Sequence, residues 1–179
     1  MKLFLKLLIL TLVLVGCKSP EARQPVTVTS GSFIKESAER NKKLNQRERQ
    51  RIEAIMAQNP EFDYVASETG FWYYYHTKVE RDTITPGFGD IVNFDYDVRD
   101  LQGRTIYSEQ EIGTQNYAMD QEELFTGLRE GLKLLKPSES ATFLFPSQKA
   151  YGYYGDNHKI GTNIPLMVKV TVNNIQQNQ

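Results

Sequence analysis

The sequence has little of what covalent or metal chemistry needs. It contains one cysteine and two histidines, His76 and His158, in 179 residues. One cysteine excludes an internal disulfide framework and a thiolate zinc cluster. No His-x-x-x-His pair, no Gly-x-Ser-x-Gly elbow and no Gly-Lys-Ser or Gly-Lys-Thr phosphate loop occurs. We therefore expect no metal, no cofactor and no covalent catalysis, and we interpret both histidines as structural or solvated.

An excess of either charge is also missing. Lysine and arginine total 21 and aspartate and glutamate total 22, which leaves a net charge of −1. The chain shows no basic stripe and no interleaving of basic with aromatic residues, so we expect no nucleic-acid partner. The composition is 40% hydrophobic and 24% charged, which gives room for one globular domain and an appendage.

The first residues have the features of a secretory signal. Lys2 and Lys6 precede an apolar run, Leu7–Val15, that is too short to span a bilayer. We predict a signal peptide over residues 1–16.

Cys17, the only cysteine, follows that signal directly. Leu14-Val15-Gly16-Cys17 resembles the bacterial lipobox, in which the cysteine is lipidated and becomes the first mature residue. The alternative is a plain signal peptide with an incidental cysteine. We predict Cys17 as a lipidation site, residues 17–32 as a flexible tether, and a cell-envelope location facing the periplasm, with the inner or outer membrane left open.

Residues 33–59 are predicted to form a charged helical arm. Charges of both signs alternate with few apolar residues until Ile52, Ile55 and Met56, which form a small patch. We expect a solvated helix whose last turns dock on the domain; the alternative is a partner-binding or dimerising arm. Asn59-Pro60 closes the segment, so the domain is assigned to residues 60–179.

The domain shows a strand-forming pattern almost throughout. Val92, Phe94, Tyr96 and Val98 alternate with polar residues, which indicates a sheet with one buried and one solvated face. Asp95, Asp97 and Asp100 fall on the polar face, where we expect solvation rather than catalysis. The five or six predicted antiparallel strands lie within Glu68–Val79, Val92–Arg99, Thr105–Ser108, Gln115–Met119, Ser140–Phe145 and Leu166–Asn173.

One helix is predicted late in the domain. Asp120 and Glu123 have the spacing of a capping box, the leucines from Leu124 to Leu135 share one face, and Lys136-Pro137 ends the helix. The predicted fold class is α+β, with a curved antiparallel sheet wrapped around one short helix. Because the sheet curls around the helix, we expect an opening between the helix N-terminus, the strand of Tyr96 and the loop of Tyr151.

A tyrosine-rich loop supplies the most informative side chains. In Ala150-Tyr151-Gly152-Tyr153-Tyr154-Gly155, three tyrosines are costly in water, so we expect their rings to be buried. An apolar pocket with tyrosine hydroxyls suits rotation of an X-Pro bond, whose barrier of ~20 kcal/mol comes from amide resonance. That reaction needs only a cleft that binds the twisted amide and a donor that holds its carbonyl.

The order and spacing of several motifs resemble those of FKBP-type peptidyl-prolyl isomerases. The resemblance runs from about Gly89 to Ile175. It rests on Gly89-Asp90-x-Val92-x-Phe94-x-Tyr96, Gly103, Phe125-x-Gly127-Leu128-x-Glu130-Gly131-Leu132, Ala150-Tyr151-Gly152, Ile160 and Leu166-x-Val168-x-Val170. It implies a half-barrel around one helix and proline-containing polypeptides as substrates.

The resemblance also implies the site residues. Tyr151 matches the loop tyrosine whose hydroxyl meets the carbonyl, and Tyr96 matches the strand tyrosine at the pocket floor. The implied substrate-binding residues are Ile106, Tyr107, Tyr117, Glu123, Leu124, Phe125, Leu128, Ile160 and Val168. Four of these depart from the best-studied members: Leu128 replaces a tryptophan, Ile106 and Val168 replace phenylalanines, and Tyr107 replaces an aspartate.

Together with the lipobox, the domain resembles the FKBP-like lipoproteins associated with gliding motility in Bacteroidota. The expected function is a membrane-tethered isomerase that assists the folding of envelope or secreted proteins, with partners in an envelope or motility complex. The alternatives are a low-activity proline-peptide binding or chaperone module, and a chain whose working part is the helical arm.

Overall fold

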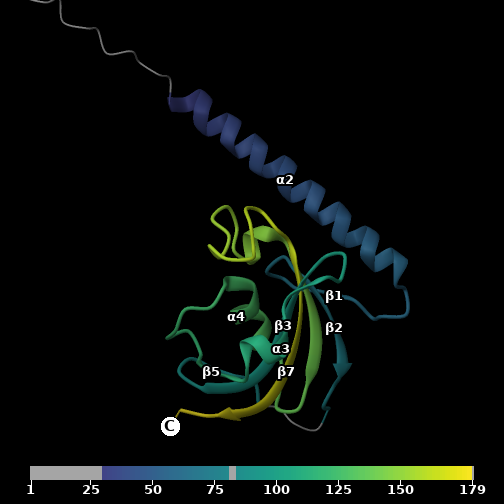
Figure 1. Cartoon of the computed structure of the whole chain (residues 1–179), viewed down its shortest axis with the longest axis vertical. Coiled ribbons are helices and arrows are strands. Elements are labelled where there is room, and N and C mark those ends of the chain that lie inside the picture. The colour runs from purple at the N-terminus through teal and green to yellow at the C-terminus, as the bar shows by residue number, and fades with distance from the viewer. Residues whose placement is uncertain (1–29, 81–83, 179) are drawn as a thin grey trace, which may run out of the picture. The chain divides into compact units, whose positions relative to one another are not determined.

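The computed structural model describes residues 30–80 and 84–178. The predictions for the signal peptide, Cys17 and most of the tether lie outside the described residues. The chain divides into two compact units, Met1–Ser37 and Ala38–Gln179. The second unit holds the whole sheet and is shown with the rest of the chain in Figure 1.

Seven antiparallel strands in the described part form one sheet, in the order β1-β2-β6-β7-β3-β4, with β5 pairing with β3. The sequence predicts five or six strands; the additional β1 was not predicted, because its two residues carry no periodic signal. The strands are β1 (Val65–Ala66), β2 (Trp72–Thr77), β3 (Ile91–Asp100), β4 (Thr105–Tyr107), β5 (Gln115–Ala118), β6 (Ser140–Phe145) and β7 (Leu166–Gln176). The predicted α+β fold is confirmed.

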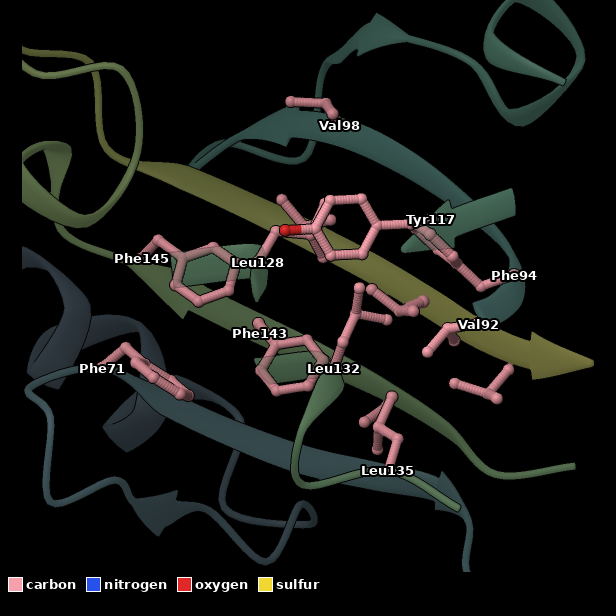
Figure 2. Packing of buried hydrophobic residues seen from close by; sticks show 14 of the residues in the cluster. Phe71, Val92, Phe94, Val98, Tyr117, Leu128, Leu132, Leu135, Phe143 and Phe145 are labelled. Carbon is pink, nitrogen blue, oxygen red and sulfur yellow. The ribbon is translucent and has the colours of Figure 1, made fainter. Parts of the chain in front are cut away.

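The concave face of the sheet packs against a short helix, α4 (Thr126–Leu132). Leu128, Leu132 and Leu135 have no exposed surface and meet Phe143 and Phe145 of β6, as Figure 2 shows. Two glycines allow this close approach. A Cβ on Gly127 would lie 2.6 Å from the Phe145 ring, and one on Gly131 would lie 2.9 Å from the Phe143 ring.

The predicted start of this helix at Asp120 is wrong. Asp120 adopts a left-handed backbone conformation with φ of 61°, and the helix begins only at Thr126. The Asp120 carboxylate accepts a hydrogen bond from Lys133 Nζ at 2.6 Å, instead of capping a helix. The segment before α4 is therefore an irregular loop, which leaves Leu124 outside the helix.

The other helices are α2 (Ser30–Gln58), α3 (Glu109–Ile112) and a 3₁₀ turn, η1 (Ser147–Lys149). Helix α2 begins at Ser30, inside the segment predicted as tether, and ends at Gln58, beside the predicted stop at Asn59-Pro60. Its residues from Ala38 onward belong to the same compact unit as the sheet. Each helix in residues 30–80 and 84–178, the long α2 included, is too short or too polar to cross a bilayer.

Helix α2 packs against Leu144 on the outer face of β6. Ile52 is buried with Leu144 and Leu101, and Ile55 and Met56 pack against them, as the predicted docking patch requires. Every residue of β6 is buried, and Ala141, Phe143 and Phe145 belong to the inner core. Ser140 and Thr142 are buried by other contacts: the Ser140 hydroxyl donates to the Val170 carbonyl at 3.0 Å, and Thr142 Oγ1 lies 2.8 Å from His76 Nε2.

Candidate active site

All predicted site residues inside the described ranges, except Glu123, belong to one apolar cluster. That cluster includes Tyr96, Ile106, Tyr107, Tyr117, Leu124, Phe125, Leu128, Tyr151, Ile160 and Val168. Glu123 is exposed. The half-barrel thus brings together side chains from four strands, β3, β4, β5 and β7, from α4 and from the loop between β6 and β7.

Burial separates these residues into two groups. Leu128 and Val168 are fully buried, and Ile160 and Tyr117 are nearly so. Tyr117 also donates from its hydroxyl to the Glu122 carbonyl at 3.1 Å, which holds the loop before α4. In this conformation these four support the site from beneath. The remaining members are half-buried, so they supply the surface that a ligand would touch.

Tyr96 and Tyr151 sit half-buried with apolar ring neighbours. The Tyr151 ring lies 5.1 Å from the Phe125 ring at the start of α4, and the Tyr96 ring stacks on Phe94 at 5.4 Å. Burial raises the pKa of Tyr151 to about 12, and the nearby Tyr96, Asp156 and Tyr107 add to that rise. Burial also raises the pKa of Tyr96. Both phenols therefore remain neutral hydrogen-bond donors at physiological pH.

Asp156, a carboxylate that no local motif marks, completes this side of the site. Asp156 accepts a hydrogen bond from the Tyr107 hydroxyl and two from the backbone N–H groups of His158 and Ile160, both at 2.8 Å. Burial acts to raise the pKa of Asp156, but these hydrogen bonds outweigh it and lower the pKa below its usual value. An acidic group thus lies near Tyr151 although position 107 carries tyrosine.

The loop that carries Tyr151 is held by a buried glutamate from α2. Glu48 is 2% exposed and accepts hydrogen bonds from Ser147 N at 2.8 Å and Ser147 Oγ at 2.7 Å. The Ser147 carbonyl in turn accepts from Gly152 N at 2.8 Å and from Ala150 N at 3.0 Å. Tyr151 lies between these two bonded residues, so Glu48 fixes the turn from which Tyr151 projects. The spacing of Glu48 with Ile52 and Ile55, on one helical face, is the signal in the sequence that points to this contact.

The expectation that all three loop tyrosines are buried is wrong. Tyr153 is 70% exposed and Tyr154 is 84% exposed, and their rings contact each other at 5.6 Å. Gly155 ends the turn at a close approach, where a Cβ would lie 2.2 Å from the Ile160 carbonyl oxygen. The chain turns so sharply that only Tyr151 faces the cluster.

The polar residues considered as alternative sites have structural roles. Asp97 is 8% exposed rather than solvated, because Arg99 pairs with it and covers it. Asp100 accepts from the backbone of Gln102 and Arg104 and closes the turn after β3. His76 Nε2 is 2.8 Å from Thr142 Oγ1. No cluster of acidic, histidine or cysteine side chains in residues 30–80 and 84–178 has the grouping of a metal site.

Two cavities lie against α2, and neither is lined by Tyr96 or Tyr151. The larger one has a volume of about 1150 Å³ and includes Ile106 of β4 in its wall. We call the half-buried surface around Tyr96 and Tyr151 the tyrosine site. It lies beside that cavity, and Ile106 belongs to both.

Known proteins similar to this chain identify its family. The family model for FKBP-type peptidyl-prolyl cis-trans isomerases matches residues 82–173. The chain belongs to this family. The match contains β3, β4, β5, α4, β6 and most of β7, which carry the cluster around Tyr96 and Tyr151, and it leaves α2, β1 and β2 outside.

A curated relative of this FKBP-family chain comes from Neisseria meningitidis. The chain is 28% identical over 134 residues to a probable FKBP-type peptidyl-prolyl cis-trans isomerase, FkpA, of Neisseria meningitidis serogroup B. That alignment covers 75% of this chain and 48% of the relative, so the chain spans about half the length of the curated relative that it matches.

Solved structures share the fold of this FKBP-family chain. A peptidyl-prolyl cis-trans isomerase from Pseudomonas syringae pv. tomato superposes with a TM-score of 0.62 at 18% identity, covering 76% of this chain and 96% of that one. FkpA from Escherichia coli superposes with a TM-score of 0.61 at 21% identity, covering 96% of this chain and 81% of that one.

Proposed function

We propose that this chain catalyses cis-trans isomerisation of X-Pro bonds in polypeptides. The observation that carries the proposal is the pair of neutral tyrosine hydroxyls, Tyr96 and Tyr151, on the half-buried edge of an apolar cluster. Family membership supports the same activity.

The chemistry needs no bond to be made or broken other than hydrogen bonds. Rotation through the twisted amide has a barrier of ~20 kcal/mol, because the carbonyl loses its conjugation with nitrogen. The apolar surface of Phe125, Leu124 and Ile106 removes water from the prolyl ring, and the Tyr151 hydroxyl donates to the carbonyl oxygen. Lowering the barrier by ~7 kcal/mol would accelerate rotation roughly 10⁵-fold.

The direct test of this activity is the isomerisation rate of short X-Pro peptides with the purified mature protein. We expect a rate that increases linearly with protein concentration, across several residues X, and that exceeds the uncatalysed rate. Rates equal to background for every peptide would refute the activity.

A binding module without useful turnover is the second candidate. The observation that favours it is Tyr107, whose hydroxyl is engaged by Asp156 at a position where the resemblance implies an aspartate. Saturable binding of proline peptides together with background isomerisation rates would select this candidate over the enzyme.

We further propose that Cys17 carries lipid and tethers the domain to a membrane of the cell envelope, where it assists the folding of envelope or secreted proteins. The lipobox-like sequence supports this proposal. We expect Cys17→Ser to abolish incorporation of labelled palmitate and to move the protein from the membrane to the soluble fraction. Unchanged membrane association of that variant would remove Cys17 as the anchor.

A role in gliding motility rests on the resemblance of the lipobox and domain together to gliding-associated lipoproteins. Deletion of the gene in a gliding host is expected to stop colony spreading, and re-expression of the full chain is expected to restore it. Normal spreading of the deletion strain would refute this role.

A further inference from the structure

The larger cavity against α2 has features of a ligand groove. Its volume is about 1150 Å³, and its walls come from the last turns of α2, the β3–β4 turn and the segment before β7. Its apolar lining includes Ala54, Ile55, Ile106, Ile164, Pro165 and Met167. All of these residues belong to the compact unit Ala38–Gln179. We call it the α2 groove.

The charged side chains on the groove are mostly positive. Arg51, Arg104 and Lys159 line it, against a single carboxylate, Asp100. Asp100 is already engaged by Arg104 Nε and by two backbone N–H groups of its own turn. Lys159 pairs with Glu111, whereas Arg51 makes no ion pair within the described residues. Arg51 is therefore the cation available to an acidic ligand.

The groove adjoins the tyrosine site through two residues. Ile106 belongs both to the groove wall and to the apolar cluster of the site. Lys159 contributes to both as well, because its backbone N–H donates to the Tyr107 hydroxyl at 3.3 Å and its ammonium lies 4.7 Å above the Tyr107 ring. A polypeptide leaving the tyrosine site over Ile106 would enter the α2 groove.

We propose that the α2 groove binds the stretch of polypeptide substrate that flanks the proline, and that it selects apolar segments carrying acidic side chains. This proposal rests on the proposed function. The apolar lining would bury aliphatic or aromatic side chains, and Arg51 would pair with a carboxylate. The consequence is that long substrates gain affinity over short ones, because only long ones reach the groove.

Two variants test the groove without touching the tyrosine site. Arg51→Glu changes the charge at position 51 from positive to negative. Ala54→Trp fills the groove with a large side chain from an exposed position on the helix. Their matched controls are Arg47→Glu and Ala57→Trp, which make the same changes on exposed positions of α2 that do not line the groove. Each protein is assayed with a tetrapeptide and with a long peptide that contains the same X-Pro bond flanked by acidic and apolar residues.

We expect both groove variants to raise KM for the long acidic peptide by about fivefold and to leave tetrapeptide turnover unchanged. The controls should match the wild type on both substrates. Replacing the acidic residues of the long peptide by lysine should weaken its binding to the wild type and favour its binding to Arg51→Glu.

Equal KM values for groove variants and controls on the long peptide would overturn the proposal. A wild-type dimer that Ala54→Trp dissociates, seen by sedimentation, would assign the groove to a second copy and would also overturn it. The proposed function fails separately, if the wild type does not isomerise the tetrapeptide. In that case the affinities of the same long peptides still test the groove.

Discussion

At the residue scale, the proposed chemistry depends on tyrosine hydroxyls that stay protonated. The pKa of Tyr151 is raised to about 12, from the usual value of 10.0, mainly by burial. Activity should therefore show no decline from tyrosine ionisation up to about pH 10.

The same shift predicts how stability responds to alkali. Tyr151 and Tyr75 both have folded-state pKa values of about 12, so the unfolded chain loses these protons first as pH rises. Stability should then decrease between about pH 10 and pH 12. Urea unfolding across this range checks the sign, and Tyr151→Phe should flatten the dependence. Stability that rises with pH in this window would contradict the assigned burial.

A second prediction concerns the hydrogen bond between Tyr107 and Asp156. Tyr107→Phe removes one donor to Asp156 and the acceptor of Lys159 N, while the backbone donors of His158 and Ile160 remain. We expect a loss of about 1 kcal/mol in unfolding free energy, since the pair is partly solvated, and a several-fold rise in KM for proline peptides. Tyr153→Phe, at an exposed position, should change neither; equal effects of the two substitutions would argue against this role of Tyr107.

At this scale the two tyrosines could be predicted from the sequence, but Asp156, the hydrogen-bond acceptor of Tyr107, could not. Tyr96 and Tyr151 are recognisable from local motifs and spacing. Asp156 is not, because its role depends on a contact with Tyr107, 49 residues away. Likewise, no local pattern reveals that Leu128 and Val168 are fully buried while Phe125 is only half-buried.

At the element scale, helix α2 is coupled to the loop of Tyr151. Glu48→Ala would leave the N–H and hydroxyl of Ser147 without their buried acceptors. We expect a loss of about 3 kcal/mol in unfolding free energy and a fall in kcat, because the turn that positions Tyr151 loosens.

Two further variants separate positioning from stability alone. Glu48→Gln keeps one acceptor and offers an amide to Ser147 Oγ, so it should recover most of the kcat. Glu53→Ala removes an exposed glutamate paired with Arg49 and should cost at most about 1 kcal/mol, with kcat unchanged. A normal kcat for folded Glu48→Ala would show that Glu48 stabilises the fold without positioning Tyr151.

Helices and strands with a regular hydrophobic pattern could be predicted from the sequence. Those whose limits depend on contacts with distant residues could not. The limits of β6 match the prediction, and β3 and β7 contain the predicted strands, because alternation over six or more residues is a robust signal. The start of α4 was wrong because Asp120 binds Lys133 instead of capping a helix. The four-residue α3 is too short to have a periodic signal.

At the scale of the whole molecule, the half-barrel determines which residues meet. Strand β3 pairs with β7, β4 and β5, and so carries Tyr96 beside elements that are far apart in the sequence. Leu144 of the same sheet is buried against Ile52 of α2. An appended helix thereby contributes to the domain core, to the α2 groove and to the support of the Tyr151 loop.

The decisive experiment compares two double variants of the full chain. Tyr96→Phe with Tyr151→Phe removes both donors and keeps the apolar rings, while Tyr153→Phe with Tyr154→Phe makes the same change at two exposed positions. The quantity to measure is kcat/KM for a short X-Pro peptide. We expect the first pair to lose roughly 100-fold and the second to stay within about twofold of the wild type. Equal kcat/KM values for the two double variants would mean that the tyrosine hydroxyls do not stabilise the twisted amide.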